Sequence, residues 1–264
     1  MTAASPLPPQ RTPWAWAVFG ALFGLIGATL WFAPAQWLAR LVATQSSARV
    51  LLGDARGTVW HGSAQLILSG GTGSQSASRL PDRLEWTIRP SWRGLDLSVH
   101  APCCMPSPWR MQAAPRWAGL TLRMEDHPTQ WPAELLIGLG TPWNTVQAHG
   151  TLLVSTRGLA LLWVDGRLTV TGGAQVDAQD MSSRLSTLRP MGSYRLTLEG
   201  GSPTVLRLST LDGSLQLSGS GQWVGSRLRF EGEASAAPDR LDALSNLLNI
   251  LGRRDGARAI IKVG

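Results

Sequence analysis

Apolar and polar residues alternate with a period of two along most of the chain after residue 55. Residues 84–89 read LEWTIR, 95–100 read LDLSVH, 194–199 read YRLTLE and 228–231 read LRFE. Alternation of this kind is typical of a β-strand with one buried face and one solvated face. About ten such segments, separated by Gly, Pro, Asp and Ser, indicate a mostly antiparallel sheet. The pattern predicts an all-β domain over 56–264, built as a sandwich or as a long curved sheet.

One purely apolar run near the start departs from this pattern. Residues 14–32, WAWAVFGALFGLIGATLWF, contain no charged side chain and have tryptophans near both ends. Since about 20 helical residues cross the hydrocarbon core of a bilayer, the run predicts a single transmembrane helix over 14–33.

A cleaved signal peptide and a buried core helix are the alternatives for this run. Only Arg11 precedes it, and bulky Trp31 and Phe32 stand where a small-residue cleavage site would be needed, so a signal peptide is disfavoured. Arg40 and Arg49 follow the run, so the local charge leaves its orientation open.

Two shorter interruptions predict helices within the β domain. Residues 131–140, WPAELLIGLG, begin with proline in the first turn and end at glycine. Residues 238–252 place leucines on one stripe, with acidic residues at the start and arginines after the end. The second helix is expected to cover an end or edge of the sheet, or to bind a partner. The predicted segments are a tail (1–13), the apolar helix (14–33), a membrane-exit linker (34–55) and the β-rich domain (56–264).

Composition and charge exclude little beyond nucleic-acid binding. The 264 residues carry 24 Lys and Arg against 17 Asp and Glu, a formal charge of +7, and Lys262 is the only lysine. The arginines are spread through the strands, without the aromatic and basic motifs of nucleic-acid-binding domains. A nucleic-acid partner is therefore not expected.

Candidate chemistry is sparse. The acidic residues fall at turns or on solvated strand faces, and the Gly-rich turns lack the lysine and helix of a phosphate loop. The four histidines are isolated, without HxxxH or CxxC spacing, so no metal site is predicted. No serine stands in a G-x-S-x-G turn between a strand and a helix. We expect a protein without enzymatic activity, cofactor or metal.

The 13 tryptophans are more informative. Trp60, Trp86 and Trp163 lie in or beside strands, where packing in the core is the ordinary role. Other tryptophans stand near Pro or Gly in connections and are candidates for partner contacts: Trp92, Trp109, Trp117, Trp131 and Trp143.

The only cysteines are neighbours, Cys103 and Cys104, in the segment APCCMP. Adjacent Cα atoms lie about 3.8 Å apart, below the usual disulfide span of about 4.4 to 6.8 Å, so a bridge between them makes a strained ring. Three interpretations stay open: this disulfide in an oxidising compartment, a bond from one thiol to a partner, and loop thiols without a defined role.

Short blocks occur in order over most of the chain: RGTVWHGSA (56–64), LPDRLEW (80–86), GLGTPWNTVQAHG (138–150), SSRLSTLRPMGSYRL (182–196), LSGSGQW (217–223) and NLLNILGRRDGARAIIKVG (246–264). Together with the apolar run, they resemble type II secretion system protein N. No block is a chemical motif, so the resemblance depends on their number and order. The motif positions expected to be structural or to contact a partner are Gly57, Thr58, Trp60, Gly62, Gly140, Pro142, Trp143 and Asn144.

The resemblance implies an accessory subunit of the machine that exports folded proteins across the outer membrane. It implies an inner-membrane location, with a single membrane pass, a cytoplasmic N-terminus and a periplasmic β domain. The partners expected are the inner-membrane platform, the periplasmic clamp and, through it, the secretin. The alternative is a membrane-tethered envelope module that binds lipid or another apolar ligand in a groove lined by strands, because the alternation leaves one face of the sheet apolar.

Overall fold

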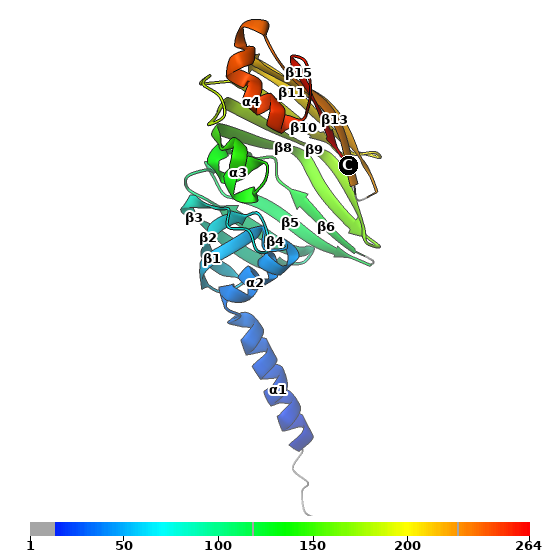
Figure 1. The fold of residues 1–264 in the computed structure, drawn as a ribbon. Helices are drawn as coiled ribbons and strands as arrows, with labels where there is room; N and C mark the ends of the chain where they lie inside the picture. Colours follow the sequence, from blue (N-terminus) through cyan, green and yellow to red (C-terminus); the bar gives the residue numbers. More distant parts are fainter. Residues whose placement is uncertain (1–13, 118, 226) are drawn as a thin grey trace, which may run out of the picture.

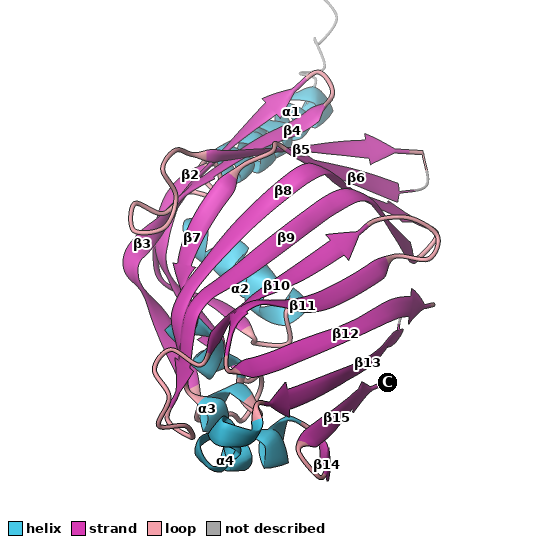
Figure 2. Cartoon of the chain, turned by 90° about the horizontal axis from the view of Figure 1, so that it is seen from above, coloured by secondary structure: helices cyan, strands magenta, loops and turns pink. Residues whose placement is uncertain are grey.

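The alternating segments form one antiparallel sheet of 15 strands in the computed structural model, which describes residues 14–117, 119–225 and 227–264 (Figure 1). The strands are β1 (Val50–Gly57), β2 (His61–Ser69), β3 (Ala77–Ser91), β4 (Gly94–His100), β5 (Trp109–Arg116), β6 (Gly119–Met124), β7 (Pro128–Pro132), β8 (Ala148–Val164), β9 (Arg167–Ser183), β10 (Gly192–Glu199), β11 (Val205–Gly213), β12 (Leu215–Val224), β13 (Arg227–Ala236), β14 (Arg253–Asp255) and β15 (Arg258–Val263). The chain is therefore mostly β, as predicted. Of the two predicted architectures it adopts the long curved sheet (Figure 2).

The described helices do not form a separate bundle. They are α1 (Trp14–Trp31), α2 (Ala35–Gln45), the 3-10 helix η1 (Ala133–Leu139), α3 (Trp143–Val146), the 3-10 helix η2 (Pro238–Arg240) and α4 (Leu241–Leu251). The helix predicted over 131–140 occurs as η1, and the one predicted over 238–252 occurs as η2 followed by α4.

The apolar run forms α1, which is shorter than the predicted 14–33. None of the helices in the described part of the chain is both long enough and apolar enough to cross a membrane. α1 has 18 residues, which make about 27 Å of helix against a hydrocarbon core of about 30 Å. The prediction of a transmembrane helix is therefore not supported by the described helices, and the predicted tail, 1–13, lies outside the described residues.

The sheet begins at Val50, earlier than the predicted boundary at 56. The alternation is hidden here because the register of β1 against β2 shifts between Gly53 and Arg56. Asp54 lies in this bulge with a φ of 46°. An extra residue in one strand reverses the apparent alternation, so sequence periodicity alone misses such a strand.

Strand order follows the chain almost everywhere, from β1 through β6 and from β8 through β13. β7 is the exception, because β6 and β7 pair with different parts of the same long strand. β6 pairs with residues 160–164 of β8, and β7 pairs with residues 151–155. The two short strands thus share one edge of β8, and β15 and β14 complete the far end of the sheet.

One face of the sheet is apolar across consecutive strands. Directly paired residues in an antiparallel sheet point to the same face. Apolar residues form whole cross-strand ladders, namely Ile88–Leu97–Met111–Met124, Pro90–Leu95–Ala113–Leu122–Leu161–Val170 and Pro115–Leu120–Trp163–Leu168. A further ladder, Val154–Val176–Leu196–Leu208, extends this apolar face into β11.

Helices α2, η1 and α4, and the loop that contains Cys104, cover parts of the apolar face and make separate small cores there. Ala35 and Leu38 of α2 pack with Ala64 and Trp86 at the β1–β3 end. Leu135 of η1 packs in a cluster with Leu80, Ala101 and Cys104. α4 covers the far end, where its buried residues Leu244, Leu247 and Leu248 pack with a cluster that includes Tyr194, Leu215, Ala234 and Ala259.

The antiparallel order gives the sheet two long borders. One border, here called the hairpin border, consists of the turns that join β1 to β2, β3 to β4, β5 to β6, β8 to β9, β10 to β11 and β12 to β13. The opposite border carries η1, α3 and α4, seen as a group at the lower side of Figure 2. Between β8 and β15, the parts of the apolar face that helices cover therefore lie near this opposite border.

Leu248→Ala should lower the free energy of unfolding by about 2 to 5 kcal/mol, because this fully buried side chain leaves a cavity under α4. Urea unfolding of the purified chain measures the change. Ile250→Ala is the control on the same helix, and its loss should be clearly smaller because Ile250 is 38% exposed. Equal losses would mean that α4 does not pack on the sheet through this stripe.

Candidate functional site

The turn between β1 and β2 joins the sheet to the N-terminal helices. The indole N–H of Trp60 donates to the carbonyl oxygen of Leu30, at 2.9 Å. The backbone N–H of Val59 donates to the carbonyl oxygen of Ala33, also at 2.9 Å. The Leu30 carbonyl lies in the last turn of α1, where carbonyl groups lack a partner within the helix, and Ala33 lies in the link between α1 and α2. The motif residue Trp60 therefore ties α1 to the sheet.

Trp86 and two glycines fix the shape of this turn. The indole N–H of Trp86 donates to the carbonyl oxygen of Val59 at 3.0 Å, from beneath the turn. A side chain at Gly62 would meet the ring of Trp86 and the carbonyl oxygen of Arg56. Gly57 has a φ of 88°, a conformation that other residues rarely adopt. The backbone N–H of Thr58 donates to the carbonyl oxygen of His61 at 2.8 Å and closes the turn.

The second group of motif positions lies beside the opposite end of the same hairpin. Gly140 has a φ of 81° and approaches Gly70 closely. The side-chain amide of Asn144 donates to the hydroxyl oxygen of Ser76 at 3.2 Å. Pro142 precedes the first residue of α3, Trp143, whose side chain is 39% exposed.

A shallow hollow of about 530 Å³ opens at this point, with Arg49 as its cationic lining residue. The other lining residues are Gly70, Ser74, Leu139, Gly140, Thr141, Trp143 and Asn144. Gly57 and Gly62 pair at one end of the β1–β2 hairpin, and Val50 and Leu68 pair at the other. The two groups of motif positions are therefore separate places in the structure and do not form one site.

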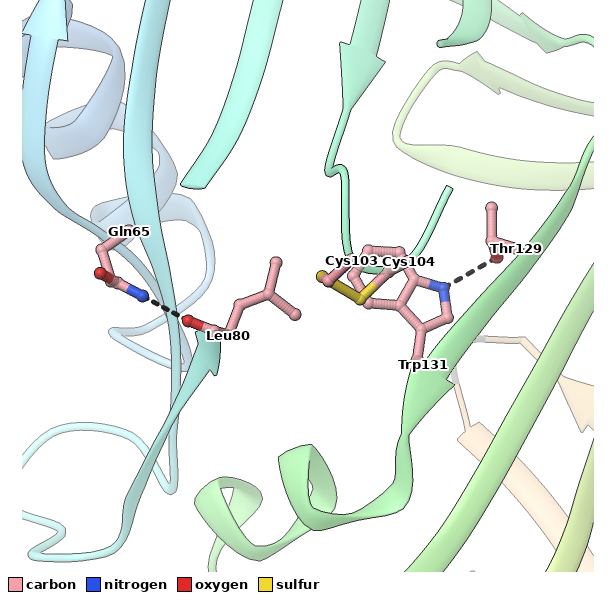
Figure 3. The surroundings of a disulfide bond; sticks show 6 residues. All are labelled: Gln65, Leu80, Cys103, Cys104, Thr129 and Trp131. Atoms are coloured by element: carbon pink, nitrogen blue, oxygen red, sulfur yellow. Dashed lines mark hydrogen bonds between the residues drawn. A yellow bond between two sulfur atoms is a disulfide. The ribbon is translucent and has the colours of Figure 1, made fainter. Parts of the chain in front are cut away.

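Cys103 and Cys104 are joined by a disulfide in the connection between β4 and β5 (Figure 3). Cys104 is buried, whereas Cys103 is exposed. Trp131 lies beside the pair, and its indole N–H donates to the hydroxyl oxygen of Thr129 at 2.8 Å. The backbone N–H of Gln130 donates to the carbonyl oxygen of Cys104 at 2.8 Å, which fastens this connection to β7.

An ion pair that sequence reasoning missed lies on the face opposite the apolar one. The guanidinium of Arg195 donates to both carboxylate oxygens of Asp177, at 2.7 and 2.8 Å. These hydrogen bonds lower the pKa of the Asp177 carboxyl below its ordinary value, and Gln175 adds a further donor. Partial burial of Asp177 opposes the shift. Each residue occupies an ordinary solvated position in a strand of alternating apolar and polar residues, so nothing in the sequence marks the two as partners.

Part of the apolar face is left open, with no helix over it among the described residues. In the Pro115–Leu120–Trp163–Leu168 ladder, Leu120 is 47% exposed, Trp163 54% and Leu168 52%. Trp163, predicted to pack in the core, is thus half exposed. Of the tryptophans predicted to contact partners, Trp92 and Trp117 are fully exposed, whereas Trp109 and Trp131 are partly buried. This surface can receive an apolar group.

Clusters of metal-ligating side chains were sought in the described part of the chain. Residues 14–117, 119–225 and 227–264 contain no group of three or more His, Cys, Asp and Glu side chains that could hold a metal ion. His149 and Glu134 make a surface pair, with Nδ1 and Oε1 2.9 Å apart. The distinctive features of the described residues are the exposed part of the apolar face and the hydrogen-bonded junction between α1 and the sheet.

A family model described as type II secretion system (T2SS), protein N matches residues 48–261. The chain belongs to this family. The match extends from just before β1 into β15, so the whole sheet is the family domain, whereas α1 and α2 precede it. No curated protein and no solved structure matches the chain.

Membership of the T2SS protein N family implies that this chain has a role in type II secretion, as a structural component of the cell envelope. The resemblance deduced from the sequence blocks is confirmed. Family membership also implies work with other subunits of the secretion system.

Trp60→Phe should cost about 1 kcal/mol of unfolding free energy for the lost hydrogen bond to Leu30, because phenylalanine keeps a six-membered aromatic ring but has no N–H to donate. The loss should also raise amide hydrogen exchange around residues 28–36, where α1 joins α2. Trp163→Phe is the control, since its ring is 54% exposed and lies away from the junction. Unchanged exchange at the junction in Trp60→Phe would show that this bond does not hold α1.

Asp177→Asn should cost about 1 kcal/mol of unfolding free energy at pH 7, because Arg195 is partly solvated. The pKa of Asp177 is lowered in the folded chain, so the stabilisation is complete above the pKa of an unfolded aspartate. It disappears as the pH falls through the lowered folded pKa. Urea unfolding from pH 7 to pH 2 measures both effects. Asp239→Asn removes an exposed pair with Arg240 and serves as the control; an identical pH profile for both variants would contradict this assignment.

Proposed function

We propose that this chain is an accessory inner-membrane subunit of the type II secretion system, whose β domain acts in the assembly of the export machine. The match of the secretion family to the entire sheet is the observation that carries this proposal. An extended sheet with a half-open apolar face offers surface for other subunits. The proposed partners are the inner-membrane platform, the periplasmic clamp and, through it, the secretin.

We propose that the role is structural and not enzymatic. Support comes from the residues that line two hollows of the surface. The hollow beside Asn144 is lined mainly by glycine, hydroxyl and apolar residues, with Arg49 as its charged member. The hollow beside the disulfide has Asp177 as its charged lining residue, and that carboxylate is bound by Arg195. The first hollow has hydroxyl groups without a carboxylate or imidazole, and in the second the carboxylate that accompanies the hydroxyls of Thr129 and Ser155 is held by Arg195.

Attachment to the inner membrane is proposed through α1, with the β domain in the periplasm. Large apolar side chains of α1, among them Phe19, Phe23 and Ile26, are more than half exposed. Water is a poor surrounding for such a helix, whereas lipid is a good one. The disulfide of Cys103 and Cys104 fits an oxidising compartment such as the periplasm.

A second candidate function is favoured by the open ladders of the apolar face. Leu120, Trp163 and Leu168 lie side by side in one row with no helix over them, and such a row can hold an acyl chain. Native mass spectrometry of the gently purified chain tests this candidate. Absence of bound lipid in every preparation would exclude it.

Deletion of the gene should reduce export of a folded type II substrate several-fold, and expression of the intact chain should restore it. Trp143 lines the hollow beside Gly140 and Asn144. A photo-crosslinking residue that replaces Trp143 should retrieve platform or clamp subunits from membranes. The same residue at Arg229 on the polar strand face is the control and should retrieve fewer. Normal export in the deletion strain, together with crosslinks to no secretion subunit, would overturn the proposal.

A further inference from the structure

Exposed tryptophans and arginines gather on the hairpin border. The β3–β4 turn carries Trp92 beside Arg93, and the β5–β6 turn carries Arg116 beside Trp117. Both tryptophan side chains are as exposed as in an extended peptide, at 106% and 107%. Large apolar side chains that gather on one part of a surface mark an interaction site for a protein or a membrane.

The β8–β9 turn continues the same pattern on the next hairpin. Trp163 lies at the end of β8, and Arg167 begins β9 after the turn. Trp163 and Leu168 are direct cross-strand partners, so they face the same way, and Leu120 on β6 extends their row toward Trp117. From β5 to β9 the border thus presents one row of apolar residues, with Arg116 and Arg167 at its turns.

The arginines of these turns are available for an external anion. Arg93, Arg116 and Arg167 are all exposed, and none takes part in the ion pairs found among the described residues. Asp165 in the β8–β9 turn is the acidic residue of these three turns. The border segment therefore carries a net positive charge.

The same border is where α1 leaves the sheet. The β1–β2 turn belongs to the hairpin border, and Trp60 and Val59 of that turn hold the backbone of Leu30 and Ala33. In Figure 1 the tips of β5–β6 and β8–β9 point toward the lower right, the side to which α1 also runs. A bilayer that holds α1 would therefore lie on the side of these turns.

We propose that the hairpin border is a docking surface for the anionic headgroup layer of the inner membrane. This inference rests on the proposed attachment of α1 to that membrane. Tryptophan favours the interface because its ring is apolar while its N–H can bond to headgroups. Arginine places its charge at the phosphate level while its stem covers apolar surface. Docking would place the border of β5–β9 against the membrane. It would cover the exposed residues at the border ends of the apolar ladders.

A bilayer explains this combination better than a protein partner does. A protein interface concentrates its tryptophans in one central pocket, surrounded by a polar rim. Here the tryptophans are spaced along successive hairpin turns, each with an arginine within a few residues, as a flat and chemically repetitive surface requires.

The test uses the full chain in nanodiscs, with an environment-sensitive fluorophore at single introduced cysteines. Trp117→Cys and Trp92→Cys place the probe on the hairpin border, and Gln75→Cys places it on the opposite border. Cys103 and Cys104 do not react because they are bonded to each other. Nanodiscs contain either phosphatidylcholine alone or phosphatidylcholine with phosphatidylglycerol, and a fraction of the lipid carries a headgroup-level quencher.

We expect strong quenching at positions 117 and 92 in the anionic nanodiscs, weaker quenching in phosphatidylcholine alone, and none at position 75. Adding Arg93→Gln, Arg116→Gln and Arg167→Gln to Trp117→Cys should lower the ratio of docked to undocked chain by about fivefold for each arginine removed. Raised salt should have a similar effect. The matched control removes the same charge from the opposite border and β3 through Arg79→Gln, Arg184→Gln and Arg189→Gln, and should leave quenching unchanged.

Equal quenching at positions 75 and 117 would overturn the inference, because it would reflect general proximity to lipid. So would protection of position 117 that requires other secretion subunits and no anionic lipid, since the border would then be a protein interface. Crosslinks to secretion subunits that persist when lipid quenching is absent would overturn the docking surface and leave the proposed function standing.

Discussion

The whole structure depends on one constraint: a single-layer sheet with an apolar face must have that face covered. A sandwich satisfies this need with a second sheet, but here all 15 strands belong to one sheet. Covering therefore falls to α2, η1 and α4, which are short and lie apart. They protect the two ends and the helical side, and they leave Leu120, Trp163 and Leu168 open. The incomplete cover is a direct result of having one layer.

The sequence predicted much of the fold because period-two alternation survives in most strands. Segments such as 84–89 and 194–199 read as strands without any tertiary information. Prediction failed where a bulge interrupts the period, as at Asp54 in β1, and for the length of the apolar helix. The end of α1 is followed by a turn at Phe32 and by the bridge between Pro34 and Thr58, and Trp60 bonds to its last turn; hydropathy reports none of these.

The candidate sites were less accessible to sequence reasoning. The blocks around Trp60 and Asn144 stood out through family resemblance, but only three-dimensional placement shows that they lie at opposite ends of one hairpin. Asp177 and Arg195 meet across neighbouring strands at ordinary solvated positions, so no local signal joins them. The tryptophans of the turns are far apart in the sequence, and their common border follows only from strand order.

The nearly sequential strand order bears on how the domain forms. Most strands pair with the strand that precedes or follows them in the chain, so each pairing closes a short loop at little entropic cost. A chain that emerges N-terminus first can therefore add strands one at a time to a growing edge, starting from the hairpin that Trp60 holds against α1. Each new edge is exposed only until the next strand arrives. α4 and β15 come last and close the far end of the sheet.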